Sequence, residues 1–156
     1  MVGADGSSGG SRVPIVAAVD GSDSAKVALN WAAQAARRED RPLHIVTVLE
    51  PIVAGTARPI LPPEIYDWLH EGAARIVEQA AGTVRSTQGV DPAGAATGTY
   101  GAGNDVIVTT EVAIGNPAPV LRELSSRAHS IVVGSRGVGG VKGLLLGSVS
   151  AHLHIG

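Results

Sequence analysis

Glycines gather late in the chain, directly after a short apolar stretch. Gly134 follows residues 131–133, two residues separate it from Gly137, and nine more precede Gly147, which stands beside Ser148. This spacing indicates a loop that leaves a strand and ends at the start of a helix. Backbone N–H groups at a helix start attract phosphate, and glycine lets a phosphate approach the backbone closely. The spacing alone fits both a phosphate-binding loop and an ordinary surface loop.

Two familiar phosphate-binding motifs are absent from this loop. A Walker loop needs a glycine, four residues and then Gly-Lys followed by Ser or Thr, whereas Lys142 follows a valine and precedes a glycine. The dinucleotide fingerprint needs a third glycine where Lys142 stands, and it follows the first strand of its domain. The loop therefore belongs to neither class.

Histidines and other reactive side chains form no convincing catalytic or metal-binding set. His152 and His154 are two positions apart, a spacing that does not share a helix face. No Ser, His and Asp arrangement has the sequence context of a hydrolase. The chain has no cysteine, which excludes disulfides and thiol chemistry. We therefore expect no catalytic residue and no protein-held metal ion.

The composition is that of one domain with a near-neutral charge. The chain has 156 residues, of which 44% are hydrophobic and 3% aromatic, and its net charge is −2. A core of Val, Ile, Leu and Ala is expected, since Phe is absent. The small net charge and the lack of a basic stripe argue against a nucleic-acid partner. No apolar run approaches the roughly 18 residues of a membrane span, and we expect a cytoplasmic protein.

Apolar stretches and helical repeats alternate along the chain. Gly21, Ser22 and Asp23 form a turn and cap before the first helix, and Asn116 caps a helix that begins at Pro117. This alternation predicts an α/β domain with an open parallel sheet and helices on both faces, of the Rossmann-like kind. The expected strands cover residues 13–19, 43–49, 106–114 and 130–133, and the helices cover residues 25–39 and 64–87 and begin again near 117 and 148.

Apolar side chains recur at helical spacing within the expected helices. Trp31 and Trp68 are interpreted as residues of the core or of helix packing. The second helix is expected to have an apolar face, which carries Ile65, Leu69, Ile76 and Val77.

Four stretches together resemble the universal stress protein family. The glycine spacing over residues 134–148 resembles the ATP-binding signature of that family. Residues 13–22 resemble its first strand and aspartate turn, and residues 43–51 resemble its second strand. Residues 112–121 resemble the end of its third strand and the turn that follows, with Asn116 in place of Asp. The similarity runs from about residue 13 to residue 152, in the order of the family.

The resemblance implies an ATP-binding protein of the stress response that retains its nucleotide with little or no turnover. Any Mg²⁺ would be held by phosphate oxygens and water rather than by protein carboxylates. With the strand order of the family, the first and fourth strands are neighbours. Ligands of open parallel sheets bind where the strand order reverses, so Asp20 and Gly134 are expected to face the same crevice.

The resemblance also implies a role for each residue of the site. Asp20 would lie near the adenosine, the backbone of Val48 would meet the adenine edge, and Ala18 and Val133 would line the base pocket. Gly134 and Gly137 would approach the ribose and phosphates, and Gly147, Ser148 and the Val149 N–H would hold the phosphate tail. Arg136 and Lys142 are candidate phosphate partners. The alternatives are a turn residue at Asp20, a plain helix cap at Ser148 and solvated cations at Arg136 and Lys142.

Three regions depart from the family pattern. Residues 1–11 are expected to be a disordered tail, and residues 88–104, with five glycines, a local insertion. The final strand of the family has no counterpart, so residues 12–156 are interpreted as a single domain truncated at its C-terminus. That strand often joins two subunits, so the resemblance implies a homodimer or a tandem-domain partner, and the missing strand leaves this pairing open.

Two other functions remain open from the residues. One is a slow ATP hydrolase or a nucleotidyl-transfer enzyme of related architecture. The other is a dimerising interaction module of the same fold that binds no nucleotide. The complete glycine signature argues against the module, and the missing strand argues weakly for it.

Overall fold

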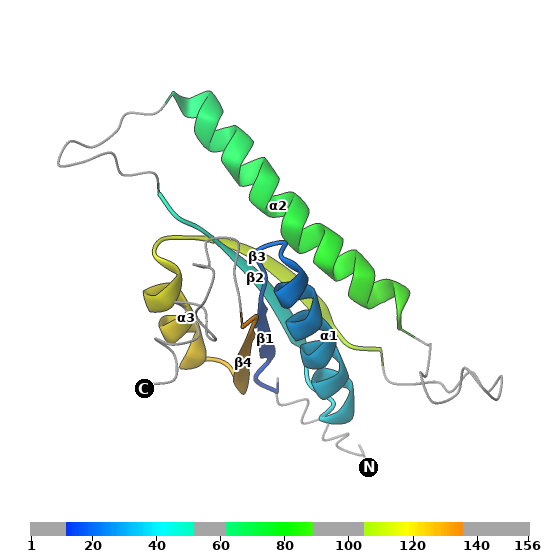
Figure 1. Cartoon of the computed structure of the whole chain (residues 1–156). Helices are drawn as coiled ribbons and strands as arrows, with labels where there is room; N and C mark the ends of the chain where they lie inside the picture. Colours follow the sequence, from blue (N-terminus) through cyan, green and yellow to red (C-terminus); the bar gives the residue numbers. More distant parts are fainter. Residues whose placement is uncertain (1–11, 52–61, 89–104, 136–156) are drawn as a thin grey trace, which may run out of the picture.

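Strands and helices alternate along the chain in the computed structural model (Figure 1). The structure describes residues 12–51, 62–88 and 105–135. Two of the four predicted strands have the predicted bounds, and the other two begin two residues later. The elements are β1 (Ile15–Ala18), α1 (Asp23–Arg38), β2 (Leu43–Leu49), α2 (Pro63–Ser86), β3 (Val108–Ile114), α3 (Pro117–Ser125) and β4 (Ser130–Val133).

The four strands form one parallel sheet in the order β3-β2-β1-β4. The chain moves outward from β1 to β3 and then returns to place β4 on the other side of β1. The strand order therefore reverses between β1 and β4, as expected. Ala18 at the end of β1 pairs with Val133 at the end of β4, so both strands end at the same level of the sheet.

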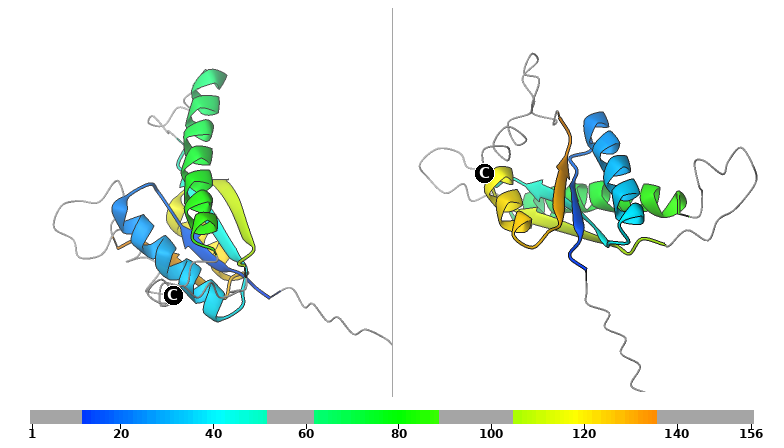
Figure 2. Two further views of the ribbon diagram at one scale, coloured as in Figure 1. Left: turned by 90° about the vertical axis from the view of Figure 1, so that its right-hand side faces the viewer. Right: turned by 90° about the horizontal axis from the view of Figure 1, so that it is seen from below.

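Helices cover both faces of the sheet, which confirms the predicted architecture (Figure 2). On one face, α1 and α2 enclose a cluster built around Ile15, Leu43 and Ile45. On the other face, Leu121 and Leu124 of α3 pack on Val16 and Val46. The side of α1 that meets the sheet is mostly alanine, which lets the helix approach the strands closely.

Both predicted helix caps are present. The Ser22 hydroxyl accepts a hydrogen bond from the Ala25 N–H at 3.2 Å, and α1 begins one residue after Ser22. The Asn116 side chain accepts from the Ala118 N–H at 3.2 Å, and Pro117 is the first residue of α3. These caps satisfy backbone donors that the helices leave without partners.

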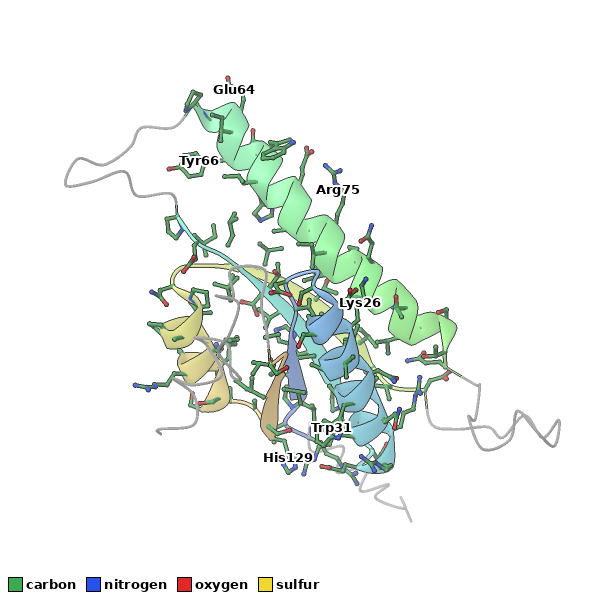
Figure 3. All side chains as sticks on the ribbon, viewed as in Figure 1. Lys26, Trp31, Glu64, Tyr66, Arg75 and His129 are labelled. Atoms are coloured by element: carbon green, nitrogen blue, oxygen red, sulfur yellow. The ribbon has the colours of Figure 1, made fainter. Side chains whose placement is uncertain are left out.

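The predicted apolar face of α2 is buried only in its second half. Val77 is buried and Ile76 packs on the core, but Ile65 is 38% exposed. A helix of 24 residues is about 36 Å long, whereas a strand of seven residues spans about 23 Å, so the helix extends past the sheet. Figure 3 shows Glu64 and Tyr66 on this extension. The predicted apolar face is therefore buried along only part of its length.

Both tryptophans are more exposed than expected. Trp31 is 54% exposed and Trp68 is 66% exposed. Trp68 lies on the extension of α2, and Trp31 lies outside the alanine-rich side of α1. The interpretation of these residues as core or packing residues was wrong, because helical spacing does not show how far a helix overlaps its sheet.

Some expectations concern residues outside the described ranges. These are the tail over residues 1–11, the glycine-rich insertion apart from Gln88, the last helix and the missing final strand. Among the helices that the structure describes, none has both the length and the apolar character needed to cross a bilayer.

Candidate functional site

The carboxyl ends of β1 and β4 form the centre of the candidate site. Because Ala18 pairs with Val133, the segment from Asp20 and the segment from Gly134 leave the sheet side by side. Both segments lie beside the first turn of α1, since β1 leads into that helix and Ser24 contacts Ser135. Two parts of the chain that are 111 residues apart therefore meet at one end of the sheet.

Asp20 has a clear structural role in the turn between β1 and α1. Its Oδ1 accepts a hydrogen bond from the Ser22 N–H at 2.9 Å. Gly21 between them has a φ of +80°, a conformation that side chains strongly disfavour. Asp20 is therefore a turn residue, as the alternative interpretation held. Its contact with a nucleoside stays a prediction.

Gly134 is packed against the first turn of α1. A Cβ at this position would lie 2.9 Å from the Ala25 nitrogen, the Ser24 carbonyl carbon and the Ser24 Oγ. These distances are too short for a side chain, and two of the three atoms belong to the backbone. Helix packing therefore requires glycine here, a reason that the sequence analysis missed. Its partner is far away in sequence, so no local pattern could reveal it.

A polar contact accompanies this packing. The hydroxyl oxygens of Ser24 and Ser135 lie 3.2 Å apart, and either can be the donor. Neither serine was singled out from the sequence. Once the reversal between β1 and β4 is known, small polar residues near both strand ends are the signal that could have identified the pair.

A half-buried apolar row lies on the α3 face at this end of the sheet. Ala18, Val48 and Val133 all pack against the cluster of Val16, Val46 and α3. The structure therefore places Ala18 and Val133, predicted to line the base pocket, and Val48, predicted to meet the adenine edge through its backbone, on one face. Ala113 and Val120 also pack against this cluster and were not among the predicted site residues.

The charges near the turn are mostly exposed. Asp23 in the first turn of α1 pairs with Lys26 at 2.9 Å. The hydrogen bond from Lys26, and then its positive charge, lower the pKa of Asp23. Because the pKa of Asp23 is lower in the folded protein than in the unfolded chain, the ionised carboxylate stabilises the fold at pH values above its unfolded pKa. This stabilisation is lost as the pH falls through the pKa of the folded protein. Because both side chains are exposed, this contribution is small.

The rest of the predicted phosphate site lies outside the described residues. This applies to Arg136, Gly137, Gly147, Ser148 and Val149, and equally to Lys142. Within the described residues, no three His, Cys, Asp or Glu side chains are grouped so that they could hold a metal ion.

Comparisons with known proteins agree on one family. The sequence model of the universal stress protein family matches residues 12–153. Universal stress protein Rv2623 of Mycobacterium tuberculosis is 33% identical over 147 residues, which cover 94% of this chain and 46% of that protein. Universal stress protein Rv1996 of the same organism is 34% identical over 145 residues, which cover 89% of this chain and 44% of that protein. The chain thus spans about half the length of these relatives.

Solved structures show the same fold. A universal stress protein from Archaeoglobus fulgidus superposes with a TM-score of 0.61 at 23% identity, with 92% of this chain and 91% of that chain covered. A universal stress protein in complex with cAMP gives a TM-score of 0.59 at 25% identity, with 91% and 89% of the chains covered. That second protein carries a nucleotide.

Proposed function

Because this chain belongs to the universal stress protein family, we propose that it binds ATP at the carboxyl ends of β1 and β4. In this proposal the protein retains the nucleotide with little or no turnover and acts as a regulator in the stress response. The proposal also places it in the cytoplasm, where ATP is abundant.

The reversal of strand order between β1 and β4 is the observation that carries this proposal. Open parallel sheets bind ligands at such a reversal, beyond the carboxyl ends of the strands. Here the reversal brings the Asp20 turn beside Gly134, the first glycine of the proposed ATP signature. A relative with the same fold binds cAMP, which supports a nucleotide as the class of ligand.

The described residues fit the base of a nucleotide, and the phosphates are proposed to bind further along the chain. The row of Ala18, Val48 and Val133 is apolar and half-buried, which suits the flat face of a base. The phosphates are assigned to the chain after β4, where Gly137, Gly147 and Ser148 belong to the signature and Arg136 and the Val149 N–H are further candidate partners. Mg²⁺ would arrive with ATP and be held by phosphate oxygens and water.

Slow turnover follows from the proposed chemistry of the site. Hydrolysis of ATP needs a group that orients or activates water and a cation that stabilises the transition state. In the described part of the site, the Asp20 carboxylate orders the turn by accepting the Ser22 N–H, and the proposal assigns it no role in activating water. A slow ATP hydrolase is the alternative, and accumulation of ADP in excess over protein would establish it.

A second candidate ligand is a cyclic nucleotide, because the relative with 25% identity was solved with cAMP. The two ligands share the base and ribose and differ in their phosphates. ATP would use the whole glycine signature, whereas cAMP would need only its first part. The relative affinities of ATP and cAMP, measured by competition for the purified protein, therefore separate the two proposals.

Identification of the nucleotide that co-purifies with the chain tests the proposal. Freshly purified protein is denatured, and the released small molecules are analysed by mass spectrometry. We expect ATP in near-stoichiometric amount and little ADP. Release of cAMP would favour the second candidate. Protein that releases no nucleotide and then binds neither ATP nor cAMP would contradict both.

We also propose that the domain acts with a second one. The curated relatives are about twice as long as this chain, which leaves room in them for another segment of similar size. The partner in this proposal is a second copy of the chain or a tandem domain. Light scattering with and without ATP would measure the oligomeric state of this chain.

A further inference from the structure

One direct polar contact joins the start of α1 to the chain that leaves β4. Ser24 is the second residue of α1, and Ser135 is the second residue after β4. Their hydroxyl oxygens are 3.2 Å apart. The contact therefore links the two segments that lie on either side of the strand reversal.

The backbone beside this contact has little space to shift. Gly134 lies so close to α1 that an added Cβ would be 2.9 Å from the Ala25 nitrogen. The Ala25 N–H is already used by the Ser22 cap at 3.2 Å. Between the described residues, the hydroxyl pair therefore provides a polar link from α1 to the exit from β4 that this amide does not provide.

We propose that Ser24 and Ser135 are positioning residues that tune nucleotide affinity without touching the nucleotide. This inference rests on the proposed function of the site. The hydrogen bond holds Gly134 at a fixed place relative to the Asp20 turn, and so reduces the ordering that binding must complete. Loss of one neutral hydrogen bond of this kind changes an equilibrium constant by about three- to fivefold.

The test is a double-mutant cycle on the full chain. ATP is titrated calorimetrically into the parent, Ser24→Ala, Ser135→Ala and the double variant. Each single substitution is expected to weaken binding about three- to fivefold, and the double variant to bind no more weakly than either single one. Ser135→Thr keeps a hydroxyl and is expected to bind like the parent. The matched control is Ser86→Ala, whose hydroxyl bonds only within α2.

The outcomes separate this inference from the proposed function. If the parent binds ATP and the two single variants bind within twofold of it, the positioning role is wrong and the proposed function stands. The same holds if the losses multiply in the double variant, since independent contacts with the nucleotide would give that result.

A measurement without nucleotide tests the contact if the parent fails to bind ATP. Hydrogen exchange of the amides at residues 24–26 and 134–135 is compared among the same variants. Both single variants are expected to exchange several-fold faster than the parent there, with Ser86→Ala unchanged. Equal exchange in all variants would overturn the inference even where the proposed function had already failed.

Discussion

At the residue scale, the candidate site depends on close contacts rather than on reactive groups. Gly134 lies against the first turn of α1, Asp20 orders its own turn, and two serines connect the segments. Each contact has a structural role, whatever ligand the site takes. Substitutions must therefore be chosen so that the structural and binding effects can be measured separately.

Gly134→Ala is expected to destabilise the fold by about 1–3 kcal/mol, since the new Cβ overlaps backbone atoms that cannot move freely. Unfolding in urea measures this loss. The matched control is Gly82→Ala in α2, where a Cβ has no neighbour within 4 Å. That change is expected to raise the free energy of unfolding by roughly 0.5–1 kcal/mol, because alanine favours the helix more than glycine does. Equal stability of Gly134→Ala and the parent would contradict the packing described for this site.

Substitutions at Asp20 separate its turn role from its charge. Asp20→Asn keeps an oxygen that can accept the Ser22 N–H, whereas Asp20→Ala removes it. We expect Asp20→Ala to lose about 1 kcal/mol of stability and Asp20→Asn to lose less. If Asp20 contacts the nucleoside, Asp20→Ala also weakens ATP binding more than tripolyphosphate binding. Equal losses for both ligands would show that Asp20 does not contact the nucleoside.

At the element scale, helix packing differs along α2. From Ala73 onward the helix buries Ala73, Val77, Ala81 and Val84 over the sheet, while its first turns extend past the strands (Figure 1). The apolar repeat continues through both halves, so the pattern alone cannot tell them apart. The length of the neighbouring strands decides where burial stops.

Two truncations on this one helix test the difference. Val77→Ala removes buried methyl groups and is expected to cost about 2 kcal/mol of stability. Ile65→Ala, twelve residues earlier on the same helix, is expected to cost under about 0.5 kcal/mol, because Ile65 is partly exposed. Denaturant unfolding of both variants gives the comparison. A loss at Ile65 as large as that at Val77 would show that something covers the first half of α2.

Locally encoded features of the fold could be predicted from the sequence, and contacts between distant segments could not. Ser22 and the pair Asn116-Pro117 mark helix starts through nearby atoms, and both were predicted correctly. The packing of Gly134 on α1 and the Ser24–Ser135 contact join distant segments, and both were missed. The exposure of the tryptophans depends on how far each helix overlaps the sheet, which their spacing does not encode.

At the scale of the whole molecule, the path of the chain through the sheet creates the site. Strand β4 returns beside β1 after β2 and β3 have been added on the other side of β1. This reversal places the Asp20 turn, the start of α1 and Gly134 at one end of the sheet. The family resemblance led us to expect the first and fourth strands to be neighbours, and the structure confirms this. The proposed nucleotide site follows from that order.

The most direct test of nucleotide binding is a calorimetric titration of ATP into the parent chain and into Gly137→Asp. A carboxylate at Gly137 would repel the phosphates that the glycine signature is proposed to hold. Gly82→Asp adds the same charge at a position with open space around it and serves as the control. We predict one ATP per chain for the parent and the control, and no binding heat for Gly137→Asp. A folded parent that gives no heat, or a Gly137→Asp variant that binds as tightly as the parent, would contradict the account.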